Sequence, residues 1–341
     1  SPDSKASSEI LRLFQSFNLL MASDNKAKSR NINKKQLKVF YKLFLSRTLS
    51  SNTIFSIINQ LIREKINAKN KARRSLIQDI MGFDLFYKTL NKTRPIFCTY
   101  FTNHVAGMMH RYWKDLFPYE FGLTKHKYDP FHAKSIIRAM DIANNDLTKL
   151  IKFSKSNNYD LWVISSMGQQ AINRGEYLPE LYLNDFQKFL LFLKKNNNNF
   201  KLLPAMQPDY CIECSTSEDL NLLRNYLKCI KDFNGKQIIF ERYPPVNNRL
   251  NICLKDSKDT FLRKKVMFND IALPIEDLGF EFIKRDMGTG YHIPEGIFLT
   301  LGGNNKRLDR YQKQIIETSR ICPTILDIFN VKIPDYMNAA L

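Results

Sequence analysis

The chain has 341 residues, of which 44% are hydrophobic, and its 52 lysines and arginines outnumber 33 aspartates and glutamates to give a formal net charge of +19. This length and apolar content fit a globular protein that buries a large core. No run of about 18 apolar residues occurs, so no membrane-spanning helix is expected.

The positive charge is concentrated near the N-terminus. Residues 1–95 hold 19 lysines and arginines and 6 aspartates and glutamates, a net charge of +13. Such a field attracts polyanions, which include nucleic acid, anionic membranes and phosphorylated substrates. We therefore expect polyanion binding through residues 26–94. The alternative is compositional drift, since abundant lysine and asparagine also suit an AT-rich genome.

Apolar spacing predicts a basic helical region over residues 1–93. Its expected helices cover residues 8–21, 36–45, 51–65 and 75–90. After Arg94-Pro95, which stops the last helix, residues 96–101 predict a short buried strand. Everything before that strand lacks a nucleophile motif.

A long helix is predicted at residues 130–156, with Asp141 and Asp146 on its polar side, and a β-branched strand follows at residues 161–164. The order strand, helix, strand from residue 96 onward is typical of a mainly parallel sheet with right-handed crossovers. Residues 94–169 and 286–341 are therefore expected to form the core of an α/β domain.

Residues 170–285 predict an inserted α/β subdomain. Its expected elements are helices at 183–195 and 218–231 and strands at 209–215, 237–241 and 250–254. The chain then returns with a strand at 297–301 and closes with a helix at 322–329. Six cysteines are scattered mostly in apolar surroundings, so we expect buried free thiols, which favour a reducing, cytoplasmic compartment.

Two segments present histidines in promising surroundings. The first, after the strand at 96–101, contains Asn103, His104, His110 and Arg111. In the second, residues 286–303, Gly288 and Gly290 precede His292, and glycines there allow a positive φ. The alternative is that these histidines make ordinary polar contacts in a cleft.

Four segments resemble, in order over about residues 94–340, the alkaline phosphatase superfamily in its phosphodiesterase and nucleotide-pyrophosphatase branch. They are residues 103–113, residues 130–164, His292-Ile293-Pro294-Glu295-Gly296, and Pro323–Asp327 followed by Pro334. The resemblance implies a three-layer α/β/α fold with a mainly parallel sheet. It also implies a phosphate- or sulfate-ester hydrolase or transferase, phosphodiesterase-like, acting on a phosphorylated or sulfated small molecule or glycan.

The resemblance also implies a metal site, in a divergent form. Members of the family bind two divalent metals, but here Ala106 replaces the ligand aspartate and Ser166-Met167 replaces an Asp-His pair. One ion at most is expected, zinc, manganese or magnesium. The implied roles are metal ligand for His110, His292 and Asn103, substitute ligand or acid–base group for His104, and oxyanion clamp for Arg111.

Two explanations of these departures stay open. In one, a segment bearing the nucleophile precedes residue 1. In the other, the protein has abandoned two-metal chemistry and keeps a cleft around His104, His110 and His292, where three imidazoles hold one metal. The alternative function is a catalytically inactive scaffold that docks on a polyanion through its basic N-terminal region.

Overall fold

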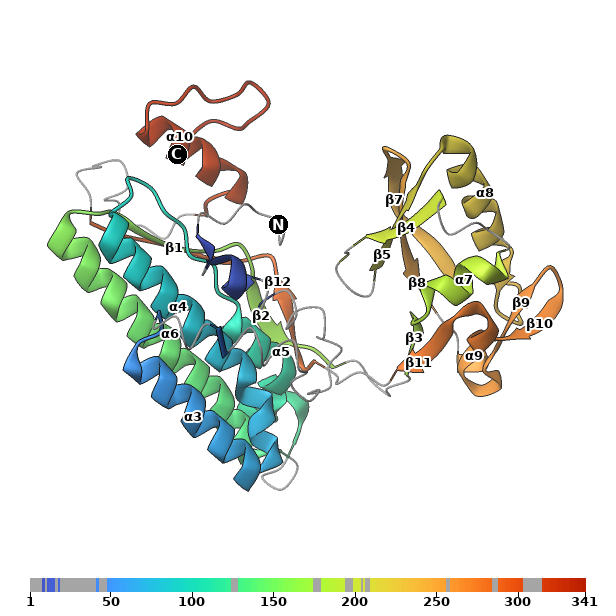
Figure 1. Cartoon of the computed structure of the whole chain (residues 1–341), viewed down its shortest axis with the longest axis horizontal. Coiled ribbons are helices and arrows are strands. Elements are labelled where there is room, and N and C mark those ends of the chain that lie inside the picture. Colours follow the sequence, from blue (N-terminus) through green and yellow to red (C-terminus); the bar gives the residue numbers. More distant parts are fainter. Residues whose placement is uncertain are drawn as a thin grey trace. The chain divides into compact units, whose positions relative to one another are not determined.

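The computed structural model describes residues 8–9, 11–15, 18, 41–42, 48–123, 128–173, 179–193, 199–203, 205, 209–255, 258–283, 288–302 and 315–341. The chain forms two compact units (Figure 1). Unit 1 comprises Ser1–Arg174 and Met287–Leu341, and unit 2 comprises Gly175–Asp286. The N-terminal helices and the segments that flank the insertion thus share one unit.

Helices dominate the first half of unit 1. They are α3 (Ser51–Ile66), the 3-10 helix η1 (Ala68–Arg73), α4 (Arg74–Thr93), α5 (His104–Leu116), η2 (Pro118–Phe121) and α6 (Pro130–Asn157). The helices predicted at 51–65, 75–90 and 130–156 are therefore confirmed. Residues 11–15 and 41–42 are helical as well; most of the helix predicted at 36–45 and part of that at 8–21 lie outside the described residues.

Local capping explains where these helices begin and end. The side chain of Ser50 accepts a hydrogen bond from the Thr53 backbone N–H at the start of α3, and Asp129 caps α6 in the same way, directly before Pro130. Such caps satisfy backbone donors that have no partner inside the helix. At its other end α4 stops at Arg94, whose φ of 44° is left-handed and precedes a proline.

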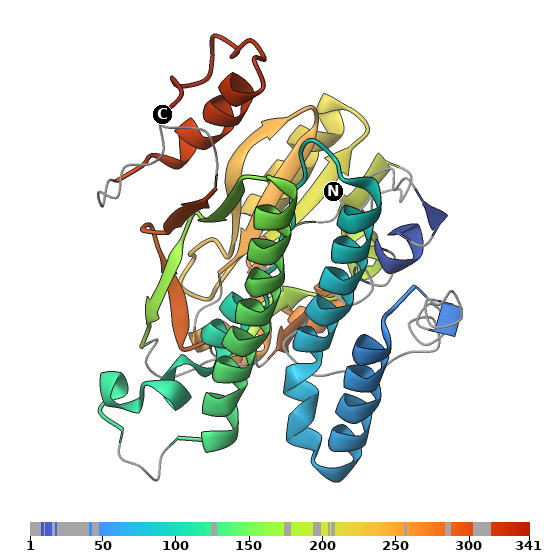
Figure 2. The same cartoon turned by 90° about the vertical axis from the view of Figure 1, so that its left-hand side faces the viewer.

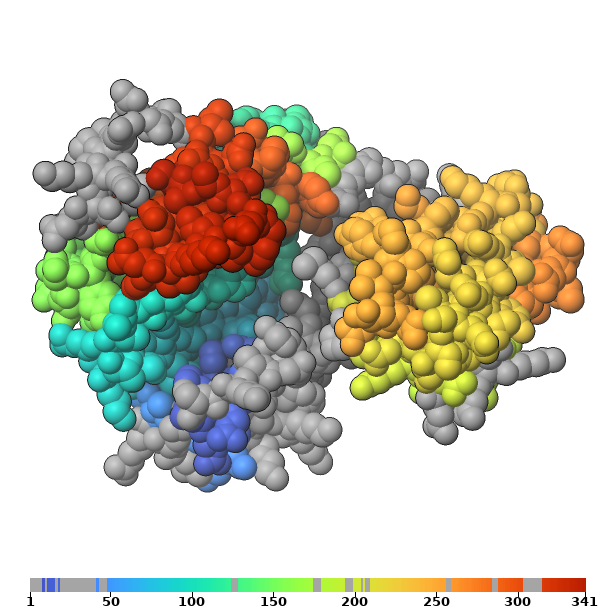
Figure 3. Space-filling view, turned by 90° about the horizontal axis from the view of Figure 1, so that it is seen from above, coloured from blue at the N-terminus to red at the C-terminus, as the bar shows by residue number. Residues whose placement is uncertain are grey.

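The strand predicted at residues 96–101 is wrong. This segment forms no strand, and Ile96 and Phe101 are each 86% exposed. The Phe97 ring instead lies edge-on to Phe329, with ring centroids 5.7 Å apart. Phe329 directly follows α10 (Ile321–Ile328), which confirms the closing helix. The C-terminal segment is red in Figure 3.

Unit 1 contains two short antiparallel ribbons. Strand β1 (Leu161–Ser165) pairs with β13 (Ile297–Leu301), and β2 (Gly168–Ala171) pairs with β12 (Gly290–Ile293). The strands predicted at 161–164 and 297–301 are confirmed, but their arrangement is not the expected one.

The expected three-layer fold with a mainly parallel sheet is wrong. Every described sheet has two to four strands, and every described pairing is antiparallel. A parallel sheet needed residues 96–101 as a strand ahead of the helix that leads to β1, and those residues form none. Strand β1 pairs instead with β13, which follows unit 2 in the sequence.

Unit 2 is built of small antiparallel sheets and short helices. Its elements are β3 (Glu180–Leu183), α7 (Phe186–Phe192), β4 (Phe200–Leu203), β5 (Asp209–Cys214), α8 (Ser217–Lys228), β6 (Ile230–Lys231), β7 (Ile239–Val246), β8 (Arg249–Leu254), α9 (Lys258–Arg263), β9 (Lys265–Phe268), β10 (Ile271–Pro274), η4 (Ile275–Leu278) and β11 (Phe280–Ile283). The largest sheet has the order β4-β5-β8-β7. Helix α7 starts later than expected because Leu183 belongs to β3 and Asp185 caps the helix.

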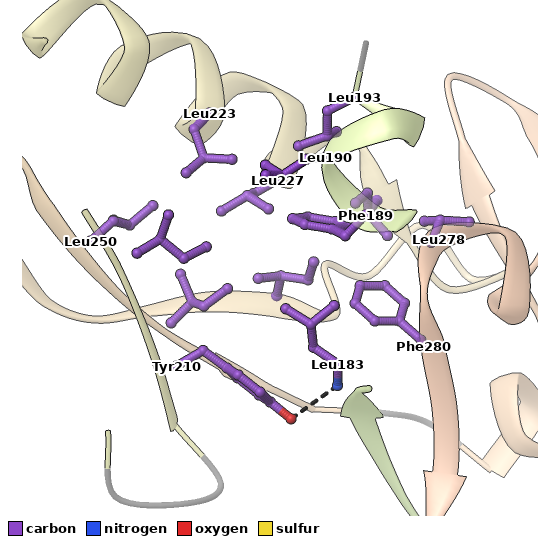
Figure 4. Close-up of a cluster of buried hydrophobic side chains, with 14 of the residues drawn as sticks. Leu183, Phe189, Leu190, Leu193, Tyr210, Leu223, Leu227, Leu250, Leu278 and Phe280 are labelled. Carbon is purple, nitrogen blue, oxygen red and sulfur yellow. Dashed lines mark hydrogen bonds between the residues drawn. The ribbon is translucent and has the colours of Figure 1, made fainter. Parts of the chain in front are cut away.

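An apolar cluster holds unit 2 together (Figure 4). Phe189 and Leu190 of α7 are fully buried, and the ring of Phe189 lies 5.6 Å from that of Phe280. The hydroxyl of Tyr210 accepts a hydrogen bond of 2.9 Å from the backbone N–H of Leu183, which satisfies the polar end of a buried ring (Figure 4).

All six cysteines are free thiols, as the sequence predicts. Cys211, Cys214 and Cys253 are buried, whereas Cys98 and Cys322 are exposed. Burial raises the pKa of the Cys214 thiol to about 11. Of the helices in the described part of the chain, none combines the length and the apolar character that crossing a membrane requires.

Candidate functional site

Helix α5 carries the first histidine of the site. One face of α5 packs on α6, where Met108, Tyr112, Ile136 and Ala139 form a buried cluster with Leu76 of α4. Another flank faces the β2–β12 ribbon, and the side-chain amide of Gln169 in β2 donates a 3.2 Å hydrogen bond to the carbonyl of Ala106. The helix is therefore held between α6 and the ribbon.

Glycines let the ribbon approach α5 closely. A Cβ atom on Gly290 would lie 2.6 Å from the carbonyl oxygen of Met109, and one on Gly288 would lie 2.8 Å from that of His110. Real Cβ atoms do not come so near a backbone oxygen. Gly290 does not have a positive φ, so the reason for glycine at this position is close approach rather than a left-handed turn.

Thr289 fastens the ribbon to the helix. Its hydroxyl oxygen accepts a 3.1 Å hydrogen bond from the backbone N–H of Lys114, and its carbonyl accepts a 2.9 Å bond from Ile172. Helix α5 is kinked nearby, since Tyr112 has non-helical angles of φ −124° and ψ 19°. No local sequence pattern indicates this role of Thr289.

The structure brings His110 and His292 together, although 182 positions separate them in the chain. Successive strand residues alternate in direction, so His292 lies on the same side of β12 as Gly290. Its Nε2 lies 2.9 Å from Nε2 of His110, and the two rings meet edge-on at 74°. His110 is half-buried and His292 is exposed.

The backbone places a proton on Nδ1 of His110. His110 Nδ1 lies 2.8 Å from the carbonyl oxygen of Gly290. A carbonyl oxygen only accepts, so His110 Nδ1 carries a proton and donates it. In neutral His110 the other nitrogen, Nε2, is then an acceptor, and His292 Nε2–H is its donor. The result is an oriented imidazole pair with a lone pair at the shared point.

Gln169 is a further residue of the site that sequence reasoning missed. It stands opposite His292 in the register of β2 and β12. Its Nε2 donates a hydrogen bond to the carbonyl oxygen of Ala106. Its Oε1 is buried and has no hydrogen-bond partner in the described part of the chain. Alternate residues of a strand point to opposite faces, so Gln169 and not Gln170 lies on the same face as His292. This follows only once the pairing of β2 with β12 is known.

His104 lies in another environment, so the expected cluster of three histidines does not form. Its ring is buried between helices: Nδ1 lies 3.2 Å from Asp79 Oδ1 of α4, and Nε2 donates a 3.0 Å hydrogen bond to the carbonyl of Ala139 in α6. Thr102 Oγ1 lies 2.7 Å from Nδ1 and also contacts Asp79 Oδ1. This network joins three helices.

The other two expected site residues have different positions. Asn103 is exposed at the N-cap position of α5, and its side chain makes no capping hydrogen bond. Arg111 follows His110 on α5 and is half-buried. Within the described residues, no hydrogen bond or ion pair occupies its guanidinium.

The hydrogen bonds of His104 identify its charge state. Thr102 Oγ1–H donates to Asp79, so Nδ1 of His104 must donate to Thr102 or Asp79, while Nε2 donates to Ala139. Both ring nitrogens then carry protons. Burial alone would lower the pKa of His104, but the hydrogen bond and charge of Asp79 raise it. Burial alone would likewise raise the pKa of Asp79, which its bonds with His104, Thr102 and Tyr100 lower.

Asp146 of α6 faces this network rather than the expected polar side of the helix. Burial, followed by the charge of Asp79, raises the pKa of Asp146 from 3.8 to about 7. The charges of Lys149 and His104 act in the opposite direction without cancelling this. Asp141, in contrast, is exposed as predicted.

We expect the pH dependence of stability to report on Asp146. Between pH of about 4 and about 7 the folded chain keeps a proton that the unfolded chain releases, so the free energy of unfolding falls as pH rises through this range. Asp146→Asn should remove this part of the slope. Urea midpoints at pH 5 and pH 8 check it, with Asp141→Asn as the exposed control; equal slopes in both variants would contradict the assignment.

Within the described residues, the site offers a metal ion two imidazoles, those of His110 and His292. No group of three or more histidine, cysteine, aspartate or glutamate side chains suited to a metal occurs in the described part of the chain. Comparison of the chain with protein-family models, curated proteins and solved structures gave no match.

Proposed function

We propose that unit 1 binds and cleaves or transfers a phosphate or sulfate ester at the His110–His292 pair. The observation that carries this proposal is the 2.9 Å approach of the two Nε2 atoms from remote parts of the chain. An imidazole pair at a solvent-accessible position suits acid–base work on an oxyanion ester near neutral pH.

The pair also fits part of a metal site. The bond from His110 Nδ1–H to Gly290 is the support that metal-bound histidines normally have, because it fixes the ring and leaves Nε2 for the metal. Two cis ligands on an ion with bonds of about 2.0–2.1 Å have nitrogens roughly 3 Å apart. His110 and His292 would hold such an ion, which would polarise an ester oxygen.

The protein groups themselves supply two further functions. When no metal is held, His292 Nε2–H can donate its proton to a departing oxygen, and water then restores that proton; His110 Nε2 accepts the hydrogen bond that orients this donor. The guanidinium of Arg111, which has no partner in the described part of the chain, suits binding of two oxygens of a phosphate or sulfate group.

The test compares the full chain with His110→Ala, His292→Ala and the double variant. We expect turnover of a chromogenic phosphodiester or sulfate ester to fall by about 10²–10⁴-fold. Bound zinc or manganese, measured by elemental analysis after dialysis, should fall to background in the double variant. Lys114→Ala, an exposed change on the same helix, should alter neither. Unchanged turnover and metal content in the double variant would refute the proposal.

A further inference from the structure

Helix α3 is inside out for a helix on the surface of a globular unit. Three of the four buried residues on the face packed on the unit are polar: Thr53, Gln60 and Glu64 are 4%, 5% and 9% exposed, and the fourth is Ile57, which packs with Ile54 in a small apolar core. The opposite face carries five large apolar side chains that are 41–80% exposed, namely Phe55, Ile58, Leu61, Ile62 and Ile66. We call these five residues the α3 stripe. Surface helices normally show the reverse pattern.

The spacing makes the stripe continuous. Phe55, Ile58, Ile62 and Ile66 recur every three or four positions, which places them along one side of a helix. Helix α3 is also the outermost long helix of its layer, beyond α4 (Figures 1 and 2). The stripe is thus a continuous exposed apolar face of α3. Exposed apolar surface of this extent marks an interaction site.

The buried polar residues show that this orientation is specified. Glu64 is paired with Arg74, with Oε2 and Nη2 2.5 Å apart, and the Gln60 amide donates to Glu64 and to the carbonyl of Asn70. Burial alone would raise the pKa of Glu64, but its hydrogen bonds to Arg74 and Gln60 lower that pKa by more than burial raises it. The Glu64 carboxylate therefore stays charged. Rotating α3 to bury the stripe would break these bonds and expose the pair.

The charges beside the stripe are positive. Arg63 and Lys65 are exposed on α3, and its one acidic residue is the buried Glu64. No aspartate or glutamate occurs between Asp24 and Glu64 in the sequence, whereas that interval holds nine lysines and arginines. An occupant of the stripe therefore meets apolar side chains and cations but almost no anions.

A small arginine cluster adjoins the C-terminal end of α3. Burial, then the neighbouring charges of Arg138 and Arg63, lowers the pKa of Arg73, and burial followed by the charge of Arg63 lowers that of Arg138. The guanidinium of Arg73 is held by Ser135 and Phe131, while Arg138 has no hydrogen bond to any described residue. Such a cluster attracts a phosphate group.

We propose that α3 docks unit 1 on an anionic phospholipid surface, with the stripe inserted among the lipid chains and Arg63, Lys65 and Arg138 at the headgroups. Interfacial helices combine these two features, an apolar face and basic flanks. A second copy of the chain is disfavoured because it brings the same positive charge to the contact. Nucleic acid is disfavoured because its phosphate backbone would bind the cations but would offer no apolar surface to the α3 stripe.

The test is co-sedimentation of the full chain with vesicles of phosphatidylcholine alone or with about 30% phosphatidylserine. The wild-type chain should bind the anionic vesicles at least tenfold more tightly than the neutral ones. Phe55→Ser/Ile62→Ser should weaken binding to anionic vesicles by at least tenfold. The control Leu262→Ser/Ile271→Ser changes two side chains of unit 2 that are 68% and 62% exposed, and it should bind as the wild type does.

A charge variant separates the two parts of the surface. Arg63→Glu/Lys65→Glu should also lose at least tenfold in affinity and should flatten its dependence on salt. Circular dichroism checks that each variant is folded. Equal binding to neutral and anionic vesicles, or a stripe variant that binds like the wild type, would overturn the proposal. So would a dimer that the stripe variant abolishes, or a preference for nucleic acid that depends on the stripe.

Discussion

Replacing Asp79 by alanine is expected to lower the free energy of unfolding of unit 1 by about 3–5 kcal/mol. The side chains of Asp79 and His104 are only 5% and 2% exposed. Without the carboxylate, the imidazolium between α4, α5 and α6 loses the counter-charge that is hydrogen-bonded to it, and Tyr100 loses its side-chain acceptor. Both effects destabilise only the folded state.

Intrinsic fluorescence in urea measures this loss, because both tryptophans, Trp113 and Trp162, belong to unit 1. Asp141→Ala removes an exposed carboxylate from α6 and should change the free energy of unfolding by less than about 0.5 kcal/mol. The double change Asp79→Ala/His104→Ala should cost less than the sum of the two single changes. Additive losses, or a loss at Asp79 no larger than that at Asp141, would show that the ion pair does not stabilise unit 1.

Phe189→Ala is the second large effect, and it concerns unit 2. Phe189 is fully buried among residues from α7, β11 and the four-stranded sheet (Figure 4). Truncating a buried phenylalanine removes its transfer free energy and leaves a cavity, so we expect a loss of about 3–5 kcal/mol. Unit 1 should keep its stability, because it has separate cores.

Hydrogen exchange resolved by peptide distinguishes the two units. Amides of β5 should exchange faster in Phe189→Ala, while those of α4 should be unchanged. Leu191 lies on the same helix but is 67% exposed, so Leu191→Ala should cost less than about 0.5 kcal/mol. Similar exchange in both variants would mean that α7 does not anchor the core of unit 2.

Local signals in the sequence predicted the helices well. Apolar periodicity placed α3, α4 and α6 within a few residues of their observed bounds. The sheet was predicted wrongly because pairing is not a local property. The apolar run at 96–101 has the composition of a buried strand, yet nothing among the described strands pairs with it. Two of its side chains are among the most exposed large hydrophobic ones in the described part of the chain.

The site was predictable in part. The resemblance singled out His110 and His292, and the structure brings these two together. It also singled out His104, which lies six positions before His110; six residues turn a helix by about 240°, so the two imidazoles cannot share a face. Recognising α5 as a helix from His104 onward would have separated them. Asp79 and Gln169 had no sequence signal, because their roles arise from contacts between remote segments.

The pairing of β2 with β12 has a consequence for how the chain tolerates change. Ala171 is paired with Gly290 in this ladder. The segment that contains the insertion therefore begins and ends at one pair of neighbouring strand residues. Lengthening, shortening or exchanging the intervening module leaves that residue pair and the two imidazoles in their places. The imidazole pair and the module can thereby change independently of each other.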